Sequence, residues 1–155
     1  MDLGPTLLLP EMPIRSVQAR EIWPLRHKVL RPHMTLEDCD YPHDNDADTF
    51  HLATIEGGRI LCIGSFYKEK CPSLEGFKPY RLRGMATEPD HRGRGLGRDL
   101  IHSALEHLRA QQADLLWCNA RENALRFYTK LDFTTHGGPF DIPGIGPHYL
   151  LSIKV

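Results

Sequence analysis

The pattern of apolar and polar residues predicts strands and helices in alternation along the chain. Apolar residues recur at intervals of three and four through residues 96–111, as on one face of an amphipathic helix. That face consists of Leu96, Leu100, Ile101, Ala104, Leu105 and Leu108. Helices are also expected at 18–30 and 123–131, and strands at 14–17, 49–56, 59–67, 80–87, 114–118 and 148–154.

Turn residues divide these elements. Gly57 and Gly58 lie between two strand patterns, which predicts a two-residue hairpin. Pro24 must lie near the first turn of its helix or kink it. Residues 31–48 are expected to form a long loop or short helix, residues 68–79 a loop, and the glycine- and proline-rich stretch 137–147 a series of turns before the last of two closing strands. The order predicts a single-domain α/β (α+β) fold over residues 12–155, behind an N-terminal extension of residues 1–11.

Composition limits the classes of function. With 155 residues, of which 41% are hydrophobic and 25% charged, the chain suits one globular domain. Its formal net charge of −1 argues against nucleic acid or an anionic membrane as a main partner. No apolar run approaches the roughly 20 residues that span a bilayer, and the first residues lack the basic lead of a signal peptide. We therefore expect a cytoplasmic protein.

Metal ligation is not expected either. Cys39, Cys62, Cys71 and Cys118 form no CxxC pair, and the nine histidines show no ligand spacing. Residues 44–48, DNDAD, begin like a calcium-binding loop, but position 6 is not glycine and position 12 is not acidic. We expect this segment to be a solvated loop.

The strongest chemical signal is residues 80–97, YRLRGMATEPDHRGRGLG, in which a strand leads into a glycine-rich turn and a helix. Glycines allow a ligand to approach the backbone, and a helix N-terminus offers unpaired N–H groups with a positive dipole. Arg92, Arg94 and Arg98 add positive charge around the same turn. The segment therefore predicts a pyrophosphate-binding turn.

Three pyrophosphate-binding patterns are candidates for this turn. A Walker loop requires Gly-Lys followed by Ser or Thr, which this chain lacks. A dinucleotide fingerprint requires a third glycine at position 98, where this chain has arginine. The third pattern, Arg/Gln-x-x-Gly-x-Gly/Ala between a strand and a helix, is matched by residues 92–97, RGRGLG.

This turn resembles the pyrophosphate loop of the GNAT superfamily of acetyl-CoA-dependent N-acetyltransferases. Residues 119–133, NARENALRFYTKLDF, are similar to the family's second motif, N-x-x-A-x-x-F-Y-x-K-x-G-F. One position departs from it, since Asp132 stands where glycine is usual. Because Asp adopts left-handed backbone geometry less readily than Gly, we expect a strained turn there with activity retained.

The resemblance implies a mixed, mostly antiparallel sheet of about six to seven strands, with a splayed parallel pair at 80–87 and 114–118. Acetyl-CoA is the implied co-substrate, with its pantetheine between the two strands. The residues implied to bind it are Met85, Ala86, Thr87, Arg92, Gly93, Arg94, Gly95, Leu96, Gly97, Arg98, Asn119 and Asn123. Asn119 and Asn123 have an alternative role as helix caps.

For catalysis, the family pattern places Tyr128 beside the sulfur, where it would protonate the leaving thiolate. The general base stays open between Glu88, at the end of the strand before the loop, and His148, with Asp141 a weaker candidate. Strand alternation predicts that Arg81, Arg83 and Met85 share one face. Arg83 either meets a substrate carboxylate or forms a salt bridge inside the fold, and we favour the salt bridge.

The function expected is direct acetyl transfer to a primary amine of a small molecule. Protein N-termini or lysines are the alternative acceptors. The oligomeric state stays undecided, with a homodimer as the candidate. Two rival functions are a non-catalytic acyl-CoA sensor, which keeps the loop but lacks a base, and a nucleotide-binding protein that uses the loop for ATP.

Overall fold

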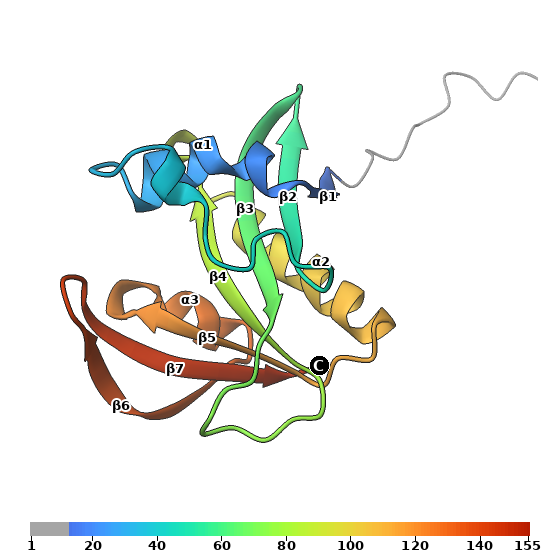
Figure 1. The fold of residues 1–155 in the computed structure, drawn as a ribbon, viewed down its shortest axis with the longest axis vertical. Helices are drawn as coiled ribbons and strands as arrows, with labels where there is room; N and C mark the ends of the chain where they lie inside the picture. Colours follow the sequence, from blue (N-terminus) through green and yellow to red (C-terminus); the bar gives the residue numbers. More distant parts are fainter. Residues whose placement is uncertain (1–12) are drawn as a thin grey trace, which may run out of the picture.

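A sheet of seven strands organises residues 13–155, the part of the chain that this computed structural model describes (Figure 1). Its strands are β1 (Ile14–Val17), β2 (Phe50–Glu56), β3 (Arg59–Lys68), β4 (Pro79–Thr87), β5 (Leu115–Arg121), β6 (Thr134–Ile142) and β7 (Gly146–Lys154). Their order is β1-β2-β3-β4-β5-β7-β6, and neighbours are antiparallel except for β4 and β5. The predicted mixed sheet is confirmed, and the extension predicted for residues 1–11 lies outside the described residues.

Helices cover both faces of the sheet. They are α1 (Ala19–Leu30), α2 (Leu96–Ala110) and α3 (Leu125–Lys130), with short 3-10 turns at Glu37–Cys39, Pro89–His91 and Glu122–Ala124. On one face, α1 packs Ile22 and Leu25 against the sheet. On the other, α2 and α3 build the larger core, and the whole apolar stripe predicted for α2 is buried. Figure 1 shows α1 in front of the sheet and α2 behind it.

The main departures from regular geometry are at the predicted turns. Gly57 and Gly58 connect β2 and β3 with positive φ angles of 57° and 75°, as a two-residue hairpin requires. Asp132, after α3, has a φ of 70°, which confirms the strained turn expected there. Pro24 lies in the second turn of α1, beyond the first turn, and on its exposed side.

The gap in the sheet arises between β4 and β5. Pairing joins Pro79, Tyr80 and Arg81 to residues 115–117, and beyond these positions the two strands separate. This confirms the predicted splayed parallel pair. The separation leaves the facing backbone edges of both strands available to a ligand.

A bulge in β4 changes which side chains face each side of the sheet. The register between β3 and β4 shifts between Ile63 and Ser65, where two β4 residues, Gly84 and Met85, face Gly64. As a result Arg83 lies beside the ring of Tyr41 on the α1 side, whereas Met85 packs against the core on the α2 side. The expectation that Arg83 and Met85 share a face is therefore wrong, because strand alternation fails at a bulge.

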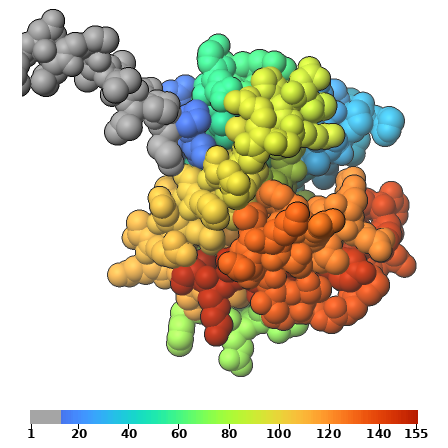
Figure 2. Space-filling view, turned by 180° about the vertical axis from the view of Figure 1, so that it is seen from behind, coloured from blue at the N-terminus to red at the C-terminus, as the bar shows by residue number. Residues whose placement is uncertain are grey.

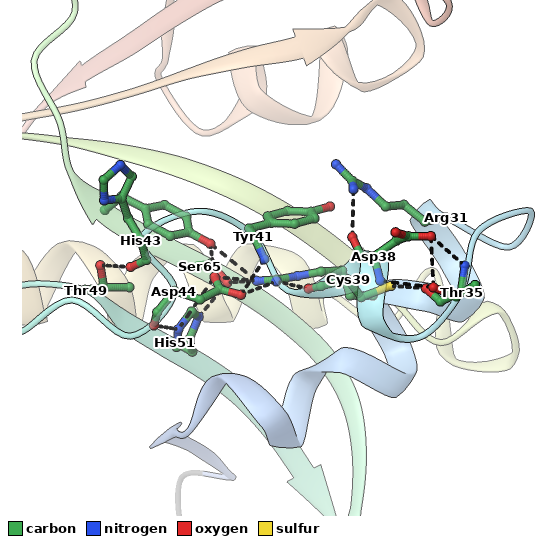
Figure 3. Close-up of polar contacts among 12 residues, drawn as sticks. Arg31, Thr35, Asp38, Cys39, Tyr41, His43, Asp44, Thr49, His51 and Ser65 are labelled. Atoms are coloured by element: carbon green, nitrogen blue, oxygen red, sulfur yellow. Dashed lines mark hydrogen bonds and ion pairs between the residues drawn. The ribbon is translucent and has the colours of Figure 1, made fainter.

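The segment expected to be solvated begins with a buried charge. Asp44 is only 4% exposed and forms an ion pair with Arg26, with 2.6 Å between Oδ2 and Nη1. The Tyr67 hydroxyl also donates to the Asp44 carboxylate. Figure 3 shows Asp44, Ser65 and His51 gathered beneath Tyr41. The segment thus anchors the loop after α1 to the sheet.

Within residues 13–155, no helix is long and apolar enough to cross a bilayer. The same residues contain no group of three or more His, Cys, Asp or Glu side chains that could hold a metal ion. All four cysteines lie in this part of the chain, and they are buried and free.

Candidate active site

A cleft of about 830 Å³ lies where β4 and β5 separate. Both faces of the sheet contribute to it, with Arg31 and Tyr41 from the α1 side and Gly97 and Phe127 from the α2 side. Seen from behind, the molecule is hollowed between the blue segment near residues 20–40 and the orange segment near 120–130 (Figure 2). Among the described residues that line the cleft, none is Asp or Glu, whereas six are arginine: Arg31, Arg81, Arg83, Arg92, Arg98 and Arg121.

One end of the cleft is the glycine-rich turn before α2. Gly93 and Gly95 have φ angles of 80° and 78°, and Gly95 is the N-cap residue of α2. A Cβ on Gly93 would meet no atom within 4 Å, so the backbone here faces open space. Because the first N–H groups of a helix have no partner within the helix, the start of α2 presents donors and a positive dipole to the cleft. This arrangement suits a pyrophosphate.

The arginines of this turn do not all face the cleft. Arg92 and Arg98 line it, together with Leu96. Arg94 instead forms an ion pair with Glu56 of β2, 2.8 Å from Nη2 to Oε1, and contacts His91. The expectation that Arg94 binds the phosphates is therefore not supported, because its charge is already matched by the carboxylate of Glu56.

The facing edges of the splayed strands line the middle of the cleft. Met85, Ala86 and Thr87 belong to β4, and Asn119 belongs to β5. Asn123 follows in the 3-10 turn Glu122–Ala124. Neither this turn nor α3 has a side-chain hydrogen bond at its cap, so neither asparagine serves as a helix cap.

Tyr128 of α3 reaches the cleft from the α2 side. Its ring packs edge-on against Phe127 and Phe133, with centroids 4.9 and 5.2 Å away. Burial raises the pKa of Tyr128 well above its ordinary value, and the neighbouring thiols of Cys118 and Cys62 raise it further. The phenol therefore stays protonated at neutral pH and can act as a proton donor.

His148 of β7 also lines the cleft. Its Nδ1 lies 2.9 Å from the carbonyl oxygen of Gly146. A carbonyl oxygen can only accept a hydrogen bond, so in the neutral imidazole the proton is on Nδ1. This contact leaves Nε2 with a lone pair, which is the form that a general base needs.

Glu88, the other candidate base, lies apart from the lining of the cleft. Its carboxylate is ion-paired with Lys28 and, at 3.4 Å, with Arg59. The hydrogen bond from Lys28 holds the pKa of Glu88 below its usual range. Two cations therefore keep Glu88 ionised and engaged, and its predicted catalytic role is not supported by this geometry.

Several lining residues escaped sequence reasoning. They come from the end of α1 and the loop after it, and from the β6–β7 turn: Val29, Leu30, Arg31, Tyr41, Ile142 and Ile145. Their sequence signal is weak, because an isolated apolar residue or tyrosine in a polar loop is common. Long-range packing, such as the Arg26–Asp44 pair, brings them to the cleft.

Comparison with known proteins places this fold and site in a family. The model of the acetyltransferase (GNAT) domain matches residues 46–135. The uncharacterized N-acetyltransferase YitI of Bacillus subtilis (strain 168) is 37% identical over 138 residues, which cover 89% of this chain and 93% of YitI. The chain therefore belongs to the GNAT family, and its class of activity is N-acetyl transfer. The resemblance deduced from the two motifs is confirmed.

Solved structures share the fold at low identity. An aminoglycoside 6'-N-acetyltransferase complexed with coenzyme A has a TM-score of 0.74 at 10% identity, covering 91% of this chain and 96% of that chain. The structure of yncA from Salmonella typhimurium with its cofactor acetyl-CoA has a TM-score of 0.71 at 18% identity, covering 91% and 92%. Escherichia coli ElaA has a TM-score of 0.70 at 15% identity, covering 90% and 97%.

Proposed function

We propose that this protein binds acetyl-CoA in the cleft between β4 and β5 and transfers the acetyl group directly to a primary amine of a small molecule. The observation that carries the proposal is the continuity of the cleft, which joins the glycine turn of α2 to Tyr128 and His148. Coenzyme A and acetyl-CoA in the structures of similar fold add support.

The residues of the cleft fit such a donor. The backbone of Gly93 to Gly97 and the side chains of Arg92 and Arg98 would hold the pyrophosphate. The unpaired edges of β4 and β5, at Met85 and Asn119, would bond the amides of pantetheine. This donor site uses the family's two motifs, which the fold brings to one cleft.

The reaction forms a C–N bond between the amine and the acetyl carbonyl carbon and breaks the C–S bond of the thioester. Tyr128, which its raised pKa keeps protonated at neutral pH, donates its proton to the departing sulfur. His148 accepts a proton from the amine at Nε2, directly or through water. The amine thus loses one proton and the thiolate gains one, and exchange with water then removes the proton from His148 and returns one to Tyr128.

An acceptor screen tests the proposal. The protein is incubated with acetyl-CoA and a panel of amino acids, aminoalkyl acids, polyamines, aminosugars and peptides, and both thiol release and acetylated product are measured. Tyr128→Phe should lower kcat by about 100-fold with little change in KM for acetyl-CoA. Tyr149→Phe, which changes a tyrosine outside the lining of the cleft, should retain activity.

Two results would overturn the proposal in distinguishable ways. If coenzyme A raises the melting temperature but no amine in the panel is acetylated, the protein is an acyl-CoA sensor. The observation that favours this rival is that no Asp or Glu is found among the described residues that line the cleft. If ATP raises the melting temperature and coenzyme A does not, the glycine turn serves a nucleotide.

A further inference from the structure

The α1 side of the cleft carries positive charge at some distance from the glycine turn. Arg31 follows α1, and Arg81 and Arg83 belong to β4, whereas Arg92 and Arg98 surround the start of α2 on the opposite face. The cleft thus has two cationic regions. One suits the pyrophosphate of the donor, and the other, on the α1 side, is free to meet a different ligand.

Two of the α1-side arginines have no acidic ion-pair partner among the residues that the structure describes. Arg81 pairs with Glu69 at 3.0 Å. Within residues 13–155, no Asp or Glu forms an ion pair with Arg31 or Arg83. The Arg31 guanidinium donates to a backbone carbonyl, that of Asp38, at 2.8 Å. The salt bridge favoured for Arg83 from the sequence is therefore absent from this part of the chain.

Tyr41 holds these arginines close together. The guanidinium carbons of Arg26, Arg31 and Arg83 lie 3.8, 4.4 and 4.7 Å from the centroid of the Tyr41 ring. Asp44 neutralises Arg26, so the remaining two charges share one aromatic ring. Figure 3 shows Arg31 and Tyr41 above the buried Asp44 network that fixes this loop. The two charges are preorganised, and neither is ion-paired with a carboxylate of residues 13–155.

The pKa and burial of Arg83 are consistent with a site for an anion. Burial lowers the pKa of Arg83 and the charge of the neighbouring Arg81 lowers it further, and together they outweigh Tyr67, Tyr41 and Glu69, which raise it. An anion beside the guanidinium would offset both effects. Folded proteins seldom leave a charge half-buried without a partner, because its desolvation is then uncompensated.

We propose that Arg83, assisted by Arg31, binds an acidic group of the acceptor, so that the substrate is an amine that also carries a carboxylate or a phosphate. The inference rests on the proposed acetyl transfer and adds the chemical class of the acceptor. A guanidinium binds both acidic groups in the same two-pronged manner. A polycationic acceptor would instead be repelled by Arg31, Arg81 and Arg83, and the part of the cleft lining that the structure describes offers it no carboxylate.

Matched acceptors test the class directly. Each primary amine is tested in four versions that differ only in the group at the other end of the molecule: a carboxylate, a carboxamide, a phosphonate or a second amine. The acidic acceptors should have kcat/KM at least 10-fold above the carboxamide and the diamine, as expected for a charge-assisted hydrogen bond. The ratio between carboxylate and phosphonate identifies which acidic group is preferred.

Variants of Arg83 test whether this side chain causes the preference for acidic acceptors. Arg83→Gln should raise KM for the acidic acceptor by about 10- to 100-fold and leave KM for acetyl-CoA and for the carboxamide unchanged. Arg83→Lys should restore part of the affinity, and Arg109→Gln, which removes an exposed arginine on α2, should change nothing. Equal use of acidic and neutral acceptors, or equal KM in Arg83→Gln, would overturn the inference and leave the proposed acetyl transfer intact.

A binding measurement keeps the test independent of turnover. The N-acetylated form of each acidic amine has no nucleophile, so it occupies the acceptor site without reacting. With coenzyme A present, it should raise the melting temperature of the wild-type protein and not that of Arg83→Gln. No shift for either protein, at millimolar ligand and with coenzyme A bound, would contradict the acidic-acceptor site.

Discussion

Gly97 packs directly against the ring of Phe127, and this contact joins the two sequence motifs of the site. A Cβ added at Gly97 would lie 3.0 Å from the Phe127 Cζ. Gly97 is in the first turn of α2, and Phe127 precedes Tyr128 in α3. The absence of a side chain at position 97 therefore lets α2 approach α3, the helix that carries Tyr128.

Gly97→Ala should disturb both helices at once. Because the added methyl group overlaps the Phe127 ring, we expect a loss of about 1–3 kcal/mol in the free energy of unfolding. KM for acetyl-CoA should rise and kcat should fall as α3 moves. Phe127→Leu provides space for the methyl group, so the double variant should recover at least about 0.5 kcal/mol relative to the sum of the single changes. If the losses in the free energy of unfolding, measured with denaturant, simply add in the double variant, the two residues are not in close contact.

Gly93 and Gly57 form a matched pair for separating backbone strain from ligand contact. Both have positive φ, 80° and 57°, and neither would bring a Cβ within 4 Å of another atom. Alanine at either position should cost about 1–2 kcal/mol of stability.

Only Gly93→Ala should affect the donor. Its methyl group would project into the turn that faces the cleft, so KM for acetyl-CoA should rise about 10-fold, equivalent to about 1.4 kcal/mol. Gly57→Ala, in the β2–β3 hairpin, should leave this KM unchanged. The same KM in both variants would show that the backbone at Gly93 does not approach the phosphates.

The features that the sequence predicts well are those with a local cause. The apolar period of α2, the Gly57-Gly58 hairpin and the two motifs depend on neighbouring residues, and each is found where expected. The bulge at Gly84 and the burial of Asp44 depend instead on partners distant in the chain, such as Arg26. For the same reason, no spacing rule indicates that the Arg83 side chain lies on the α1 side of the sheet or that Arg94 pairs with Glu56.

Asp132→Gly should stabilise the protein. Asp132 is exposed and has a φ of 70°, which a glycine adopts without steric cost. After the greater flexibility of glycine in the unfolded chain is subtracted, we expect a gain of about 0.5–1 kcal/mol, or a melting temperature higher by about 1–4 °C. Activity should stay unchanged, because the turn follows Tyr128 and does not line the cleft.

Gln112 offers a control for this effect. It is exposed, follows α2 and has a φ of 62°, so Gln112→Gly should give a gain of the same size. If Gln112→Gly stabilises and Asp132→Gly does not, the Asp132 side chain makes a compensating interaction that backbone geometry does not reveal.

His51 should make the protein less stable at mildly acidic pH. Its Nε2 lies 2.8 Å from the Asp44 carbonyl oxygen and its Nδ1 2.7 Å from the Ser65 hydroxyl, which also accepts from Arg26. A carbonyl can only accept, so Nε2 carries the proton and Ser65 donates to Nδ1. Burial lowers the pKa of His51 and outweighs the hydrogen bond to the Asp44 carbonyl and the charge of the Asp44 carboxylate, both of which raise it. The folded protein therefore holds this histidine neutral.

The sign of the pH dependence follows from this lowered pKa. As the pH falls below about 6.5, the unfolded chain takes up a proton at His51 before the folded protein does, so the free energy of unfolding decreases. His51→Gln should be less stable at pH 7.5, because hydrogen bonds are lost, yet its melting temperature should decline less between pH 7.5 and 5.5. Some decline should remain, since burial also lowers the pKa of His107. His102→Gln changes an exposed histidine and should keep the wild-type slope. An unchanged slope in His51→Gln would contradict a lowered pKa of His51 in the folded protein.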